Sequence, residues 1–189
     1  MSARYVGIDE MTPVLEWLAC QRAEAVHAHF SMFRVAFENP QVLGSSFGAS
    51  DAMRRLNQFG NVLATTVRRT DLVARDLTDF WVVAPECNVD MVGCRLCEIA
   101  NSVTDFGLDV VDCSVGVYLF PIKDVDFAGM GGRKVLERLR TFTPHFCFDP
   151  ARDCAVTWMM RTGQSLDDWK GQMRSNCFRL RTLCAGANP

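Results

Sequence analysis

Apolar and polar positions repeat with two different periods along this chain, and these periods predict helices and strands in turn. Thr12 and Pro13 are typical of a helix start, with Thr as the N-cap and Pro as the first helical residue. We therefore expect a helix from this point toward His27. Residues 32–37 are apolar with Arg34 as the only charge, which predicts a buried strand.

The next segments show a helical period followed by two short apolar runs. Asn39 and Pro40 end the first strand, and Ser50 is expected to cap a second helix. Its apolar residues recur at spacings of three and four, which is the period of one helix face: Met53, Leu56, Phe59 and Leu63. Residues 71–75 and 80–84 predict the two strands of a tight hairpin.

The following stretch predicts two more helices and one more strand. We expect a helix over residues 89–103, a strongly β-prone strand over 110–120, and a helix after Gly131 and Gly132 whose inner face holds Val135, Leu136 and Leu139. The predicted order is αβαββαβα, which indicates a sheet covered by helices. The expected fold class is therefore α+β.

The C-terminal segment predicts an extra hairpin and a last helix. Residues 146–148 and 155–158 read as the hairpin, and Ser165 begins a sequence similar to a capping box. The helix behind it carries an apolar stripe that must be buried: Trp169, Met173, Cys177, Leu180 and Cys184. Either the stripe packs on its own domain, or it forms a homodimer or partner interface. We divide the chain into a domain, 1–143, and an extension, 144–189.

Composition and charge exclude several classes of protein. The chain has 189 residues, 49% of them hydrophobic and 22% charged, which is ordinary for one globular domain. A net charge of −2 provides no field that would attract nucleic acid, so no nucleic-acid partner is expected. No apolar run is long enough for a membrane span, and no signal-peptide pattern is present. The expected location is the cytoplasm.

Cysteine and histidine residues give no firm metal or cofactor site. The chain has nine cysteines, which we interpret as reduced and mostly buried thiols. Cys94 and Cys97 have the CxxC spacing of zinc ligands, but no second such pair or paired histidine accompanies them. His27 and His29 are expected in a solvated turn. We expect no cofactor.

Residues 67–85, VRRTDLVARDLTDFWVVAP, resemble the segment around the signature motif of GGDEF domains, the diguanylate cyclase family. There an RxxD sequence enters a strand that ends in Arg, followed by the GGDEF hairpin and an apolar strand that ends in Pro. Other landmarks occur in the family's order and spacing: Asp9 to Thr12 for its DxLT entry, residues 30–37 for its first core strand, Phe47-Gly48, and Cys113 to Pro121. The resemblance implies the cyclase-like α+β fold.

The chemistry that this resemblance would imply is not retained. The residues aligned with the metal-binding Asp and with the guanine-reading Asn and Asp are Ala36, Gly44 and Met53. Asp76-Leu77 replaces the two glycines of a hairpin that is one residue shorter, although phosphate needs a backbone open to close approach. Magnesium requires hard carboxylate ligands. We therefore expect that the chain is not an active cyclase.

An alternative metal site remains open. Glu38 lies two residues after Ala36 on the same expected strand face, and Asp79 takes the place of the catalytic acid of the hairpin. These two carboxylates could hold a metal ion for residual cyclase activity or another nucleotide reaction. The other interpretation is that both are solvated charges.

The RxxD element, Arg68 to Asp71, is retained before the hairpin. This element resembles the inhibitory product site of the family. In that site the Arg binds phosphate and guanine, and the Asp accepts a hydrogen bond from the guanine edge. Here Arg68 and Asp71, with Arg95 as a second arginine, are the expected contacts of cyclic di-GMP. The alternative is a structural Arg–Asp pair at a strand entrance. We expect a catalytically inactive regulatory or protein-interaction domain of bacterial signalling, with a cyclic di-GMP receptor as the second hypothesis.

Overall fold

The computed structural model describes residues 5–21, 30–37, 39–87, 89–108, 111, 113–120, 122, 127, 129–148 and 156–157. The apolar stripe expected between Trp169 and Cys184 lies outside these residues. None of the helices described is both long enough and apolar enough to cross a membrane.

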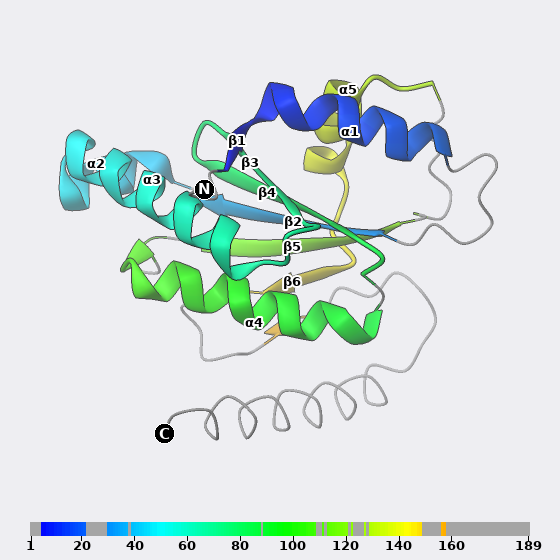
Figure 1. Cartoon of the computed structure of the whole chain (residues 1–189). Coiled ribbons are helices and arrows are strands. Elements are labelled where there is room, and N and C mark those ends of the chain that lie inside the picture. The colour runs from blue at the N-terminus through cyan, green and yellow to red at the C-terminus, as the bar shows by residue number, and fades with distance from the viewer. Residues whose placement is uncertain are drawn as a thin grey trace.

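The strands form one mixed sheet (Figure 1). They are β1 (Val6–Gly7), β2 (Phe30–Phe37), β3 (Leu72–Asp76), β4 (Asp79–Pro85), β5 (Cys113–Phe120), β6 (Phe146–Phe148) and β7 (Val156–Thr157). Their order across the sheet is β1-β3-β4-β2-β5-β6-β7. Among these described strands only the β1–β3 pair is parallel, and every other neighbouring pair is antiparallel.

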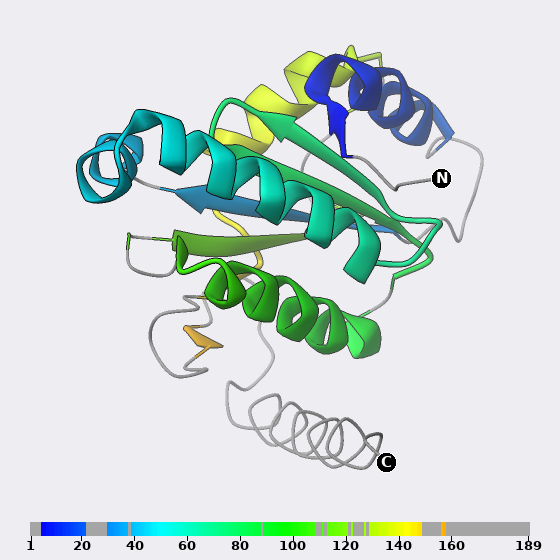
Figure 2. The same ribbon diagram turned by 60° about the vertical axis from the view of Figure 1, so that its left-hand side comes forward.

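Five helices of the described residues accompany the sheet: α1 (Ile8–Gln21), α2 (Pro40–Phe47), α3 (Ala49–Thr66), α4 (Val89–Asp105) and α5 (Gly132–Thr141). Helices α3 and α4 cover one face of the sheet, and α1 and α5 cover the other, as two views show (Figures 1 and 2). Helix α2 extends from one end of α3. The structure thus confirms an α+β fold with helices on both faces.

Two apolar cores follow from the alternation of side chains along each strand. In β2, Phe33 and Val35 point toward α3 and α4, whereas Met32 points toward α1 and α5. In β4, Trp81 belongs to the α1 and α5 side. The central strands are buried on both faces, which explains why residues 32–37 read as a continuous apolar run.

The start of α1 differs from the expectation. The helix begins at Ile8, so Thr12 is not its N-cap and Pro13 lies inside it. Proline has no N–H to donate to the carbonyl four residues earlier, which is that of Asp9. The Thr12 hydroxyl donates to this carbonyl at 3.0 Å. The Thr-Pro pair therefore supports the interior of the helix instead of starting it.

The region between β2 and α3 contains a helix that the sequence pattern did not predict. Asn39-Pro40 does end the strand, but Pro40 is also the first residue of α2. Gly48, with φ of 77°, ends α2 and caps α3, so Ser50 is not the cap. Met53 is 48% exposed and does not belong to the buried face of α3.

The predicted strand pairing is confirmed. β3 and β4 pair antiparallel, with Ala74 opposite Trp81, and β2 lies in the middle of the sheet. Both strands of the expected C-terminal hairpin are present, because β6 pairs antiparallel with β7 and also with β5. The first part of the extension therefore continues the sheet of the main domain.

Candidate functional site

The β3–β4 hairpin has a two-residue turn, Leu77-Thr78, between Asp76 and Asp79. Leu77 has φ of 57°, which glycine adopts freely and a leucine adopts only at a cost. Its side chain is 84% exposed. The turn thus keeps a left-handed residue, as expected for a tight two-residue hairpin, but fills that position with an apolar side chain.

Asp79, the first residue of β4, forms an ion pair with Arg34 of β2. The Asp79 carboxylate oxygen Oδ2 lies 2.8 Å from Nε and 2.7 Å from Nη2 of Arg34. The side chains are 13% and 25% exposed, so water weakens this interaction only in part. The guanidinium also lies over the ring of Trp81, 5.7 Å from its centroid.

Asp76, the last residue of β3, has its own arginine. Its carboxylate accepts a hydrogen bond from Arg140 of α5. Asp76 and Asp79 face each other directly across the hairpin, where two like charges would repel. Each of these two residues, which we call the hairpin acids, is instead neutralised by an arginine from a different element.

The strand beside the hairpin acids offers no metal ligand where the family resemblance would place one. Ala36 is on β2, opposite Ser114 of β5, and carries only a methyl group. Gly44 lies in α2 and the exposed Met53 in α3. Glu38, the other half of the alternative metal pair, lies outside the described residues. Within the described residues, no group of three or more His, Cys, Asp or Glu side chains could hold a metal ion.

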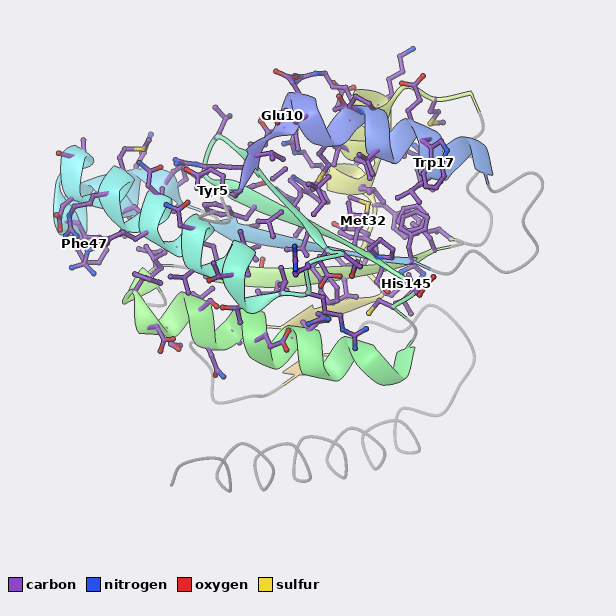
Figure 3. The ribbon with its side chains drawn as sticks, in the orientation of Figure 1. Tyr5, Glu10, Trp17, Met32, Phe47 and His145 are labelled. Atoms are coloured by element: carbon purple, nitrogen blue, oxygen red, sulfur yellow. The ribbon has the colours of Figure 1, made fainter. Side chains whose placement is uncertain are left out.

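Arg75 holds the turn from the other side of the hairpin. Its Nε donates to the Leu77 carbonyl at 2.6 Å, and its Nη1 donates to Asn57 Oδ1 at 2.5 Å. The same Asn57 oxygen accepts from the Tyr5 hydroxyl at 2.9 Å. Tyr5 lies beside α3 (Figure 3) and packs edge-on against Phe80. The N-terminal segment and the turn are thus joined through one amide.

The RxxD element is built around a buried carboxylate. The Asp71 side chain is 1% exposed and pairs with Nε of Arg95 at 3.1 Å, and the Arg95 side chain is 5% exposed. Arg95 also pairs with Glu98, one turn further along α4. The Asp71 carboxylate accepts from the backbone N–H of Arg68 at 3.0 Å. A structural Asp–Arg pair is therefore present, but its arginine is Arg95.

Arg68 is exposed, and so is its neighbour Arg69. Within the described part of the chain, neither guanidinium has a hydrogen bond or an ion pair. The three residues expected to bind cyclic di-GMP are thus close together but unequal. One guanidinium is open to an anion, while Asp71 and Arg95 already satisfy each other inside the protein.

Two other titratable groups respond to burial. Burial raises the pKa of the Cys87 thiol, against a smaller lowering effect of the Ser31 hydroxyl, so this thiol stays protonated. Burial also lowers the pKa of His145. Its Nδ1 accepts from the Leu119 N–H at 3.2 Å, which requires an unprotonated Nδ1. The side chains of Cys94 and Cys97, and both His27 and His29, lie outside the description.

The sequence pattern did not identify the arginines that hold the hairpin acids. The single charge in an otherwise apolar strand was a usable signal for Arg34, because a half-buried arginine needs a carboxylate partner. Arg140 had no such signal. It lies 64 residues from Asp76 on a helix with several other basic residues.

Comparison with known proteins identifies the fold. No family model matches the chain, and no curated protein matches it by sequence. Solved structures do match, and they show that the chain has a GGDEF-like fold.

Three matching structures illustrate this likeness. Diguanylate cyclase SiaD of Pseudomonas aeruginosa, solved with its activator SiaC, has a TM-score of 0.56 and 17% identity over 70% of this chain and 51% of its own. The GGDEF domain of YfiN (TpbB) from the same organism has a TM-score of 0.56 and 14% identity over 72% and 86%. That of Caulobacter crescentus DgcB, in complex with c-di-GMP, has 0.51 and 17% over 71% and 78%. The chain therefore spans about half the length of SiaD.

Proposed function

We propose that this chain is a catalytically inactive GGDEF-like domain that acts in bacterial cyclic di-GMP signalling by binding proteins. One observation carries the proposal. Both hairpin acids are engaged by internal arginines, Asp79 by Arg34 and Asp76 by Arg140, beside an alanine at the expected metal position.

The physical reason is the charge that metal binding needs. Magnesium is bound at the phosphates by carboxylates that are free to approach it. Asp79 would have to leave Arg34, and the freed guanidinium would then repel the metal ion. The turn residue Leu77 adds a side chain where phosphate would need bare backbone. A binding role is in keeping with SiaD, whose structure was solved with a protein activator.

The direct test is incubation of the full chain with GTP and magnesium or manganese. We expect no cyclic di-GMP above a control without enzyme, while an active cyclase domain run in parallel gives product. If product forms and Asp79→Ala or Glu38→Ala abolishes it, the chain is a residual cyclase or another metal-dependent nucleotide enzyme. That outcome would reject the proposal.

A second candidate function is a cyclic di-GMP receptor at Arg68. The exposed guanidinia of Arg68 and Arg69 support it, and DgcB was solved with this nucleotide. The burial of Asp71 and its pairing with Arg95 count against it, because that carboxylate could reach the guanine edge only by breaking the pair. We therefore place the interaction role first.

Calorimetric titration separates these two functions. A receptor should bind cyclic di-GMP with a Kd of about 1 µM or tighter. Arg68→Ala should weaken binding about tenfold or more, since hydrogen bonds to charged groups contribute about 1.5–3 kcal/mol. Arg138→Ala, at an exposed arginine on α5, is the matched control. Binding insensitive to Arg68→Ala would exclude this site.

We further propose that residues 144–189 form an extension that contributes to partner binding or to folding. Because β6 pairs with β5, a truncation should leave β6 and β7 intact. Deletion of residues 165–189 should lower the melting temperature or abolish association in a pull-down. A truncated chain that keeps both properties would show that this segment is passive.

A further inference from the structure

Helices α1 and α5 lie side by side on one face of the sheet and carry opposite charge (Figures 1 and 2). Helix α1 contains three acidic residues and no basic residue. Helix α5 contains four basic residues and one acidic residue, Glu137. The two helices therefore have equal and opposite formal charges, although the net charge of the whole chain is only −2.

Ion pairs among the described residues neutralise only part of the charge on these two helices. Arg133 of α5 pairs with Asp9 of α1, and Arg140 turns away to Asp76 in the sheet. Lys134 and Arg138 are exposed, and within the described residues neither has an ion pair. The remaining basic charge therefore lies on the outer face of α5.

The remaining acids lie on the outer face of α1. Glu10 is exposed, and its carboxylate accepts only a long hydrogen bond of 3.3 Å from the Gly7 N–H. Glu16 is also exposed, with its carboxylate close to Gly131 at the N-terminus of α5. Neither acid has a basic partner among the described residues.

An exposed tryptophan belongs to the same surface. Trp17 follows Glu16 on α1 (Figure 3) and is 59% exposed. Tryptophan is enriched among the residues that contribute most to binding at protein interfaces, where neighbouring contacts exclude water from it. We call the outer surface of these two helices, with Glu10, Glu16, Trp17, Lys134 and Arg138, the α1/α5 face.

We propose that the α1/α5 face is a two-fold symmetric interface between two copies of this chain. In a two-fold dimer the same patch is used by both copies, so it must complement itself. A two-fold axis that lies in the interface between the directions of the two helices places α1 of one copy over α5 of the other, twice. Glu10 and Glu16 then face Lys134 and Arg138 of the second copy, and both Trp17 side chains become buried.

Charge complementarity favours a second copy over a different protein. A separate acidic or basic partner would match one of the two helices and be repelled by the other. This inference deepens the interaction role proposed above, on which it rests, by naming the surface and the partner. The GTP turnover assay tests the loss of catalysis separately, so failure of one proposal can be told from failure of the other.

Charge reversal on each helix provides the test. The variant Glu10→Lys/Glu16→Lys makes both helices basic, and Lys134→Glu/Arg138→Glu makes both acidic. We expect sedimentation equilibrium at low salt to show a dimer for the natural sequence and a loss of association of at least tenfold for each variant alone. Mixing the two variants should restore association, because each basic helix then meets an acidic one.

Controls distinguish this surface from general charge effects. Arg68→Glu/Arg69→Glu changes the net charge as much as the acidic variant but lies outside the α1/α5 face, so it should leave the dimer intact. Trp17→Ala should weaken association about tenfold or more. Added salt should weaken the natural dimer. Restored association in the mixture also shows that both variants are folded.

Two results would overturn the proposal. One is a natural chain that stays monomeric at low salt up to its solubility limit. The other is a dimer whose affinity is unchanged by either charge reversal, which would place the interface elsewhere. A mixture that fails to associate while both variants keep their circular dichroism spectra would also reject the pairing of α1 with α5.

Discussion

Two Asp–Arg pairs stand at opposite ends of the β3–β4 hairpin and differ mainly in burial. Asp71 precedes β3 and pairs with Arg95, with side chains 1% and 5% exposed. Asp79 begins β4 and pairs with Arg34, with side chains 13% and 25% exposed. The first pair is sealed inside the protein, whereas the second remains in contact with water.

The difference shows how one interaction can serve two purposes. A buried charge without a partner is costly, so the Asp71–Arg95 pair locks α4 to the entrance of β3. The partly exposed Asp79–Arg34 pair is worth less for stability, and it neutralises the carboxylate of Asp79. Each pair contains a residue to which the family resemblance would assign a role in binding a nucleotide or a metal ion.

The largest effect is expected from breaking the buried pair. Arg95→Met leaves the Asp71 carboxylate buried without a counter-charge and should destabilise the fold by about 3–5 kcal/mol. Urea unfolding followed by circular dichroism measures this loss. The double variant Asp71→Asn/Arg95→Met removes both charges and should recover part of it. A loss below about 1 kcal/mol for Arg95→Met would show that water reaches Asp71.

A smaller loss of unfolding free energy is expected at the partly exposed Asp79–Arg34 pair. Arg34→Met should cost about 1–2 kcal/mol, because water can still solvate Asp79 once the guanidinium is gone. The same unfolding measurement allows a direct comparison with Arg95→Met. The loss of unfolding free energy should be larger for Arg95→Met, at the more buried pair, than for Arg34→Met. Equal losses would contradict the distinction between the two pairs.

A substitution in the hairpin turn should raise the stability of the domain instead of lowering it. Leu77→Gly places a residue without a β-carbon at φ of 57° and should stabilise the domain by about 1 kcal/mol. Leu77→Ala is the matched control, since it removes the same exposed surface but keeps the β-carbon. If both variants change the melting temperature equally, strain at this position is negligible.

The smallest effect concerns pH at a third site. Burial lowers the pKa of His145, so the unfolded chain binds this proton more readily than the folded one. Neutral His145 therefore contributes to stability above its ordinary pKa of about 6.5. This contribution is lost as the pH falls through the lower pKa of His145 in the folded chain. His145→Gln should reduce the decline in stability over this range. An unchanged pH profile would show that burial does not lower the pKa of His145 in the folded chain.

Periodicity in the sequence predicted the fold class and most elements, because burial on a sheet or a helix imposes a local spacing. The hairpin, the central strand β2 and the inner face of α5 follow this rule. The prediction failed for the start of α1 and for α2. There, Pro13 and Pro40 have the same chemistry but different positions in a helix, and only the surrounding hydrogen bonds distinguish them.

By itself, the sequence determined that the residue aligned with the metal-binding Asp of the family has no carboxylate, since the side chain of Ala36 is a methyl group in any fold. The tertiary structure alone decided the partners of the remaining charges. Arg34 and Asp79 are 45 residues apart, and Arg140 and Asp76 are 64 apart. Ion pairs between different elements have no sequence period, because any two elements that pack together can bring such charges into contact. The sheet and its two helical layers therefore determine which aspartates are sealed and which are only neutralised.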